Sequence, residues 1–238
     1  MTESPEIQSF SPKRSNAFAE FGRGSFASLS WLAGSPIVNA RIVRSARDMN
    51  EARQMIASHF ARFLERCHID VHVDGPLPKP GVGCVVCYNE SSFSDVAAYG
   101  KVMWPHLDRA AAADIYSFIP FGRAATQKAG IEMVPRGNRA GTDRLLAKMV
   151  EAVQRGERLA WGGEGKIQGF DGVGRFKIGA SLIAIRAQVP VVPVTFFGGH
   201  HTLPLGSVRA RPGQIKVRFG EPIPTAGVTE DNARVFAD

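Results

Sequence analysis

Two carboxylates lie in the segment 89–95, NESSFSD, directly after an apolar run. Glu90 and Asp95 are five positions apart, whereas residues on one face of a helix are three or four apart. We therefore expect Glu90 in a strand-to-helix turn and Asp95 one turn into the helix, with their carboxyl groups still close enough to approach each other. A carboxylate held in this way can accept a proton from a reacting group, which is general base chemistry.

Three further segments could contribute to the same site. The run 130–136, GIEMVPR, is strand-like and ends in Arg136. The run 161–166, WGGEGK, is a glycine-rich turn in which backbone N–H groups can approach an anion, and Lys166 adds positive charge. The run 189–194, VPVVPV, reads as a buried strand whose prolines suit the edge or the end of a sheet.

In this order the segments resemble the motifs of the glycerolipid acyltransferase family, the 1-acylglycerol-3-phosphate and glycerol-3-phosphate acyltransferases. Members of that family carry Asn-His-x4-Asp, a strand ending in Arg, Phe-Pro-Glu-Gly-Thr-Arg, and Val-Pro-Val-Val-Pro-Val. The resemblance runs from residue 70 to residue 225. It includes IPFG at 119–122, FKIG at 176–179 and VRFGEPI at 217–223.

The resemblance implies a mechanism and a set of site residues. In the family the histidine is the general base, the aspartate orients it, and the deprotonated glycerol hydroxyl attacks the thioester of acyl-CoA or acyl carrier protein. By position, the catalytic roles fall on Glu90 and Asp95. Neither a metal nor a cofactor is expected beyond the acyl thioester co-substrate. The acceptor phosphate is expected to contact Arg136, Gly163, Glu164, Gly165 and Lys166.

This chain departs from the family pattern at both sites. Glu90 stands at the histidine position, and Gly163, Lys166 and Ile167 replace proline, threonine and arginine of the third motif. A free glutamate has a pKa about two units below that of histidine, which lowers the driving force for proton transfer by roughly 3 kcal/mol. Burial beside Asp95 would raise the pKa of Glu90, and a helix N-terminus would lower it. Two interpretations stay open: acyl transfer with Glu90 as base, or an inactive homologue that binds lipid or acyl thioester.

Simpler interpretations of the same residues also exist. Glu90 could stabilise a helix macrodipole, and Arg136 and Lys166 could be solvated surface charges. His200 and His201 follow an apolar strand, and one of them could supply the missing imidazole, although loop histidines are usually solvated. A metal site built from the acidic pair and a histidine would lack the close ligand spacing of dedicated sites.

The elements around these segments predict the fold. Helical spacing of apolar residues covers 48–67, 141–157 and 176–188, and strand-like runs cover 69–75, 84–89, 158–163, 189–197 and 214–223. Strands that alternate with helices favour a single α/β domain with a mainly parallel central sheet covered by helices. We expect a flexible leader at 1–25, an N-terminal helical segment at 26–68, and an acyltransferase-like domain at 69–238.

Charge and hydropathy indicate the partners. The chain has 29 Lys+Arg against 22 Asp+Glu, a net charge of +7, which suits an anionic partner. The segment 26–43 is apolar but interrupted by Ser, Gly, Pro and Asn, so we expect it to lie on a membrane or pack on the domain rather than span. The sequence has no basic run with interleaved aromatic residues, so we do not expect a nucleic-acid partner. We expect a cytoplasmic protein held peripherally on the inner face of the membrane.

The cysteines do not indicate a disulfide framework. There are three, and Cys84 and Cys87 lie three apart in one apolar strand, so their thiols should point to opposite faces. We expect both to be structural, in a reducing compartment.

Overall fold

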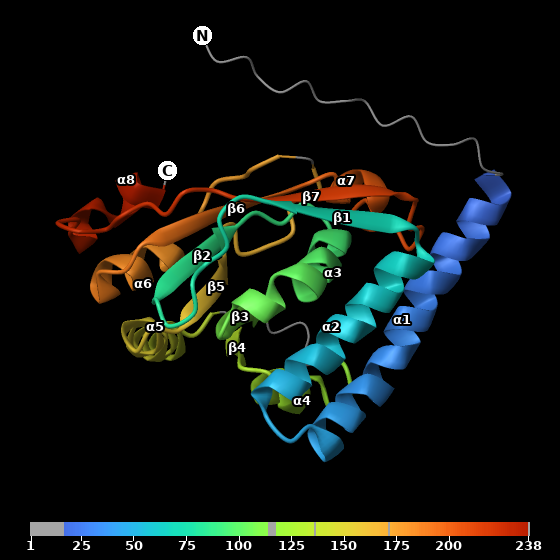
Figure 1. The fold of residues 1–238 in the computed structure, drawn as a ribbon, viewed down its shortest axis with the longest axis horizontal. Coiled ribbons are helices and arrows are strands. Elements are labelled where there is room, and N and C mark those ends of the chain that lie inside the picture. The colour runs from blue at the N-terminus through green and yellow to red at the C-terminus, as the bar shows by residue number, and fades with distance from the viewer. Residues whose placement is uncertain (1–16, 114–117, 136, 171, 238) are drawn as a thin grey trace, which may run out of the picture.

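A seven-stranded sheet forms the centre of the computed structural model, which describes residues 17–113, 118–135, 137–170 and 172–237 (Figure 1). The strand order is β1-β7-β6-β2-β5-β3-β4. Strands β6, β2, β5, β3 and β4 are parallel, while β7 is antiparallel to β6 and parallel to β1 at the edge. The predicted α/β domain with a mainly parallel sheet is therefore confirmed. The strands are β1 Ile69–Asp74, β2 Cys84–Tyr88, β3 Arg109–Ala113, β4 Ile131–Val134, β5 Arg158–Gly162, β6 Val191–Phe197 and β7 Gly213–Phe219.

Helices cover both faces of the sheet, as Figure 1 shows. Helices α2 and α3 contribute to a buried cluster on one face, and α5 and α6 contribute to a cluster on the other. Helix α1 packs on α2 and α4 at the outside of the first face. The helices are α1 Ala17–Ser45, α2 Met49–Arg66, α3 Phe93–Val102, α4 Gly122–Lys128, α5 Arg139–Gln154, α6 Gly179–Ala187, α7 Gly199–Thr202 and α8 Ala233–Ala237, with short 3-10 turns at Trp104–His106 and Glu230–Asn232.

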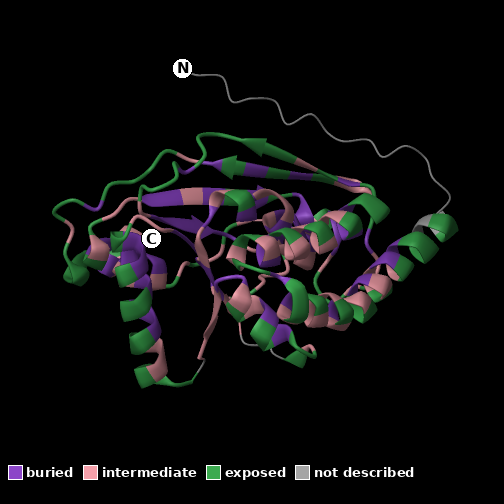
Figure 2. Ribbon diagram, turned by 60° about the horizontal axis from the view of Figure 1, so that its bottom comes forward, coloured by how far each residue is buried: buried purple, intermediate pink, exposed green. Residues whose placement is uncertain are grey.

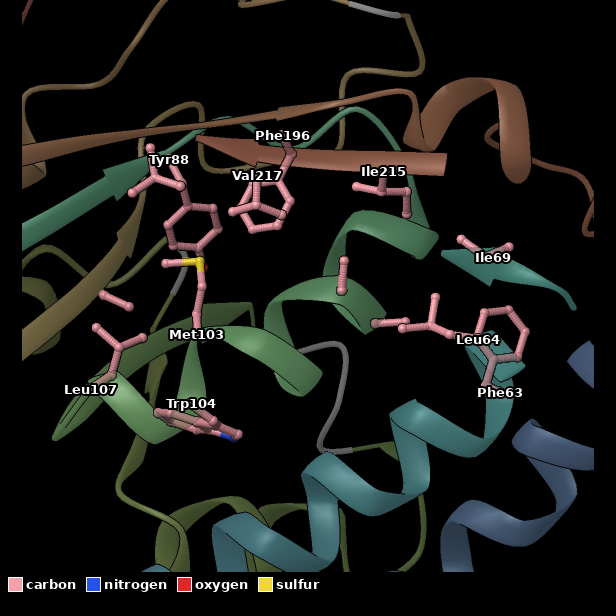
Figure 3. Close-up of a cluster of buried hydrophobic side chains, with 14 of the residues drawn as sticks. Phe63, Leu64, Ile69, Tyr88, Met103, Trp104, Leu107, Phe196, Ile215 and Val217 are labelled. Carbon is pink, nitrogen blue, oxygen red and sulfur yellow. The ribbon is translucent and has the colours of Figure 1, made fainter. Parts of the chain in front are cut away.

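Strand β2 runs through the centre of the core, and all five of its residues are buried. Side chains alternate along a strand, so Val86 and Tyr88 join the α3-side cluster while Val85 and Cys87 join the α5-side cluster. Cys84 lies in the first cluster, which confirms that the two thiols diverge. Figure 3 shows Tyr88 pointing into the α3-side cluster with Phe196 and Met103.

The N-terminal segment forms two antiparallel helices. Helix α1 begins at Ala17, so residues 17–25 of the predicted leader are helical, whereas residues 1–16 lie outside the described part. Trp31 anchors α1, with its ring 5.5 Å from that of Phe60 and 4.7 Å from that of Phe93. Within the described residues, no helix combines the length and apolarity that crossing a bilayer requires. Figure 2 shows buried residues gathered in the sheet and many exposed residues along the helices.

Two expectations about strands were incomplete or wrong. The prolines of 189–194 do not place that strand at an edge, because β6 lies between β7 and β2. Pro193 is tolerated since the β6–β7 ladder begins only at Val194, and the Pro193 carbonyl still accepts from the N–H of Gly220 at 2.8 Å. Strand β3 was not predicted, because its run of alanines lacks the β-branched and aromatic residues that mark strands.

Candidate active site at the carboxyl edge of the sheet

The turn between β2 and α3 holds the predicted acidic pair. Ser92 is the N-cap of α3 and forms a capping box with Asp95. One oxygen of Asp95, Oδ2, accepts from the N–H of Ser91 at 2.8 Å, its hydroxyl at 2.7 Å and the N–H of Ser92 at 3.0 Å. Asp95 is 1% exposed. This carboxylate therefore fixes the shape of the turn that carries Glu90.

Glu164 joins the acidic turn to the glycine-rich turn after β5. Its Oε2 accepts from the backbone N–H of Glu90 at 2.8 Å, and its Oε1 accepts from the N–H of Gly174. Two more bonds run between the turns, from the N–H of Gln168 to the Glu90 carbonyl at 2.9 Å and from the N–H of Gly169 to the Ser91 carbonyl at 3.1 Å. Glu164 is 3% exposed. The first and third motifs thus form one hydrogen-bonded unit.

Asn89 connects this unit to the neighbouring strand. Its side-chain oxygen accepts from the N–H of Phe196 at 2.7 Å, and its amide donates to the carbonyls of Phe196 at 3.0 Å and Gly172 at 3.1 Å. Asn89 is 1% exposed, so these bonds satisfy a buried amide. Analysis of the sequence did not assign this role, although the asparagine is the first letter of the family's first motif.

Glu90 lies at the carboxyl end of β2 above β5. A methyl group added at Gly162 would lie 3.4 Å from Glu90 Oε2 and 3.8 Å from the Tyr88 hydroxyl, so the glycine leaves room for both groups. Glu90 is half-buried, and together with Asp95 it lines a narrow void of about 130 Å³. Burial raises the pKa of Tyr99, which also lines the void, and the charge of Glu90 raises it further. The void is too narrow to admit a water molecule, so a ligand would have to meet Glu90 from outside it.

The residues predicted to bind the acceptor phosphate differ from one another in their exposure. Gly163 has no room for a side chain, because an added Cβ would lie 2.7 Å from the ring of Phe176. Gly165 has φ +68°, and a Cβ there would lie 3.1 Å from the ammonium nitrogen of Lys177. Lys166 is exposed at the tip of the turn. Arg136 lies outside the described residues, so its predicted place in the site stays a prediction.

The segment after β6 closes the site on its other side. An added Cβ at Gly199 would overlap Asp95 Oδ1, so α7 approaches the acidic turn through this glycine. Ser94 extends the contact, because its hydroxyl lies 2.7 Å from that of Thr202 and donates to the Gly199 carbonyl at 2.9 Å. The next residue in the chain, His200, is half-buried on α7. The alternative that His200 or His201 supplies the missing imidazole stays untested.

A second hollow lies at the opposite, amino edge of the sheet. It is open to solvent, has a volume of about 400 Å³, and lies between the start of α2 and the starts of β3 and β5. Its charges are paired: Arg109 contacts Glu157 at 2.6 Å, and Asp108 accepts from Arg158 at 2.8 Å. Arg53 donates to the carbonyls of three loop residues at this edge, Leu107, Asp108 and Ala129. Across the described ranges, no group of three or more His, Cys, Asp or Glu residues could hold a metal ion.

Comparison with known proteins identifies the class. The family described as Acyltransferase matches residues 68–197, more than half of the chain, and covers β1 to β6 with the acidic turn and the glycine-rich turn. The chain belongs to this acyltransferase family.

Individual relatives narrow the resemblance. The chain is 28% identical over 164 residues to a Caenorhabditis elegans protein provisionally named 1-acyl-sn-glycerol-3-phosphate acyltransferase acl-2, covering 66% of this chain and 56% of the relative. It is 28% identical over 148 residues to the Brassica napus chloroplastic 1-acyl-sn-glycerol-3-phosphate acyltransferase BAT2, covering 62% and 42%. The chain thus spans about half the length of the curated relatives it matches.

A solved structure confirms the fold. The 1-acyl-sn-glycerophosphate (LPA) acyltransferase PlsC from Thermotoga maritima superposes with a TM-score of 0.67 at 22% identity, covering 92% of this chain and 90% of that chain. Because the match extends over nearly the whole of both chains, the two-helix N-terminal segment belongs to the shared architecture.

Proposed function

We propose that this protein transfers an acyl group from acyl-CoA or acyl carrier protein to a lysophospholipid, with 1-acylglycerol-3-phosphate as the acceptor, in phospholipid biosynthesis. The hydrogen bond from the Glu90 N–H to the buried Glu164 carboxylate carries the proposal. It unites the two motifs that the family uses for base and acceptor at the carboxyl edge of a parallel sheet, where α/β folds bind ligands. The names of the relatives support the choice of acceptor.

In the proposed reaction, the Glu90 carboxylate accepts the proton of the acceptor's glycerol hydroxyl. The hydroxyl oxygen attacks the thioester carbonyl carbon, an ester C–O bond forms, the C–S bond breaks, and the thiolate leaves and takes the proton from Glu90. Asp95 and Glu164 act as positioning residues, since their oxygens hold the backbone around Glu90. The acceptor phosphate would contact Lys166 and Arg136. The backbone of Gly163 is not available to it, because its N–H donates to the Tyr88 carbonyl at 2.8 Å and its carbonyl accepts from the N–H of Lys177 at 2.8 Å.

The proposed location is the cytoplasmic face of an anionic membrane. Six large apolar side chains of α1 are exposed, and Phe18, Phe26 and Ile37 are 84%, 69% and 72% exposed. Such a helix, in a protein of net charge +7, suits peripheral attachment in the plane of an interface. The six residues are Phe18, Phe21, Phe26, Leu29, Leu32 and Ile37, which we call the α1 stripe.

A second candidate function is binding of a lipid or acyl thioester without turnover. Asp95 Oδ2 already accepts from Ser91 and Ser92, so this aspartate is engaged in capping rather than in orienting an imidazole. Glutamate at the base position also favours binding without turnover, because glutamate is a weaker base than histidine.

Turnover with defined substrates separates the two candidates. Purified native chain is incubated with lysophosphatidate in vesicles and with acyl-CoA or acyl carrier protein thioester, and diacyl product is measured. We expect product, and a loss of about 100-fold or more in Glu90→Gln. Glu230→Gln is the matched control, because Glu230 is an exposed surface glutamate paired with Arg186. Product that appears only in Glu90→His would favour the binding protein, and product from the native chain would exclude it.

A further inference from the structure

Two loops at the mouth of the site expose apolar side chains beside the acidic turn. One is the glycine loop, residues 163–170, whose N–H groups at Gln168 and Gly169 donate to the carbonyls of Glu90 and Ser91. The other is the α7 loop, residues 203–211, which follows Gly199 and its contact with Asp95. Their exposed apolar residues form what we call the rim patch: Phe170, Leu205 and Val208, which are 47%, 55% and 58% exposed.

The two loops touch each other. A methyl group added at Gly169 would lie 3.0 Å from Cδ2 of Leu205, so the leucine packs across the glycine loop while half of its surface remains exposed. The rim patch is therefore one surface contributed by two segments far apart in sequence. Since the glycine loop is bonded to the Glu90 turn, the surface lies next to the proposed base.

The α7 loop, which carries two residues of the rim patch, also contacts helix α1. The guanidinium carbon of Arg209 lies 5.4 Å from the centre of the Phe21 ring, and an added Cβ at Gly24 would overlap the Ala210 carbonyl oxygen. Helix α1 thus packs on the α7 loop, and Phe21 lies where the stripe meets the loop. The α1 stripe and the loop that carries Leu205 and Val208 therefore lie next to each other at Phe21.

Within residues 163–170 and 203–211, cations outnumber acids. The two loops carry three cations, Lys166, Arg209 and Arg211, and one acid, Glu164. Glu164 is 3% exposed and accepts two backbone N–H groups, so it presents no carboxylate to the outside. Exposed apolar side chains mixed with cations match the interface of an anionic bilayer, where apolar groups enter the acyl boundary and cations meet lipid headgroups.

We propose that the rim patch is a second bilayer contact, which together with the α1 stripe holds the mouth of the site against an anionic lipid surface. This inference rests on the proposed function, and it adds that the acceptor reaches the site from the bilayer. A lysophospholipid could then present its hydroxyl to Glu90 while its acyl chain stays in the bilayer. The narrow void beside Glu90 fits this arrangement, because it does not need to enclose the whole lipid.

The test is vesicle binding of the full chain, read by co-sedimentation with vesicles of phosphatidylglycerol and phosphatidylcholine. We expect Leu205→Asn/Val208→Asn to weaken the affinity about tenfold, since two partly exposed aliphatic side chains lose their burial in lipid without a change of charge. Val235→Asn is the matched control, because Val235 is 77% exposed on α8, and it should bind as the native chain does. Equal affinity of the rim double variant and the control would overturn the proposal.

Turnover adds a second readout. The rim double variant should lose activity on long-chain lysophosphatidate in vesicles and keep the native rate on a monomeric short-chain analogue. If instead only its KM for acyl carrier protein rose while vesicle affinity stayed native, the patch would be a protein-docking surface and the proposal would be wrong. Vesicle affinity is measured without turnover, so it tests the rim patch even in a chain that catalyses nothing. Arg211→Gln should weaken binding at low salt more than at high salt, which keeps the test valid if the double variant does not fold.

Discussion

The two edges of the sheet differ in the size of their hollows and in which of them carries the candidate catalytic residues. The amino edge has an open hollow of about 400 Å³, and its charged groups, among them Arg158 and Asp108, are paired with one another. At the carboxyl edge, the void beside Glu90 is too narrow for a water molecule, yet the acidic turn, Asn89 and Glu164 converge there. Strand polarity explains the difference, because loops after parallel strands meet at the carboxyl edge and carry the functional groups. The direction of the strands, rather than the size of the hollow, locates the site.

The largest expected effect lies at the amino edge. Arg158 has 8% side-chain exposure and donates to both oxygens of Asp108, so Arg158→Ala removes the charge that pairs with this carboxylate and leaves it only the backbone N–H of residue 158. We expect a loss of about 3 kcal/mol in the free energy of unfolding, measured by chemical denaturation. Arg155→Ala is the control, since Arg155 is 57% exposed and its pair with Glu157 should contribute less than about 1 kcal/mol. Loss of turnover per folded molecule in Arg158→Ala would contradict the claim that the catalytic residues lie only at the carboxyl edge.

A smaller effect is expected where α7 meets the acidic turn. Gly199→Ala places a methyl group against Asp95 and should destabilise the fold by about 1–3 kcal/mol while lowering turnover, because Asp95 positions the Glu90 turn. Thermal unfolding and initial rates measure the two effects. Gly22→Ala is the control, since no atom within 4 Å meets an added Cβ at that helical position. Native stability in Gly199→Ala would show that α7 does not press on the acidic turn.

The smallest effect concerns the thiols of β2, which begins at the amino edge and ends at the carboxyl edge. Burial raises the pKa of Cys84 to about 11 and that of Cys87 to about 12. We expect neither thiol to react with a disulfide reagent at pH 8 in the folded chain, and all three cysteines to react after unfolding. Because the folded pKa values lie above the ordinary value of 9.0, the stability they contribute is present below pH 9 and is lost as pH rises through 11. Fast labelling of Cys84 or Cys87 in the folded chain would mean that the structure opens locally and exposes β2.

Local patterns in the sequence predicted much of this arrangement. The acidic turn, the glycine-rich turn and six of the seven strands follow from apolar runs that end in polar or glycine-rich segments. The remaining facts depend on contacts between distant segments. Glu164 reaches the backbone of Glu90 across 74 positions, and Asn89 reaches Phe196 across 107, which no local pattern encodes. The central place of β6 was missed for the same reason, since Pro193 is tolerated only because of where β7 ends.

The most direct test of the central claim is the pH dependence of kcat/KM for the native chain and for Glu90→His. If Glu90 is the base, activity of the native chain falls at acidic pH as its carboxylate is protonated. Histidine at this position should move that acidic limb upward by about two pH units, the difference between the free side chains. An acidic limb at the same pH in both proteins would contradict the account, because the proton would then be accepted by another group.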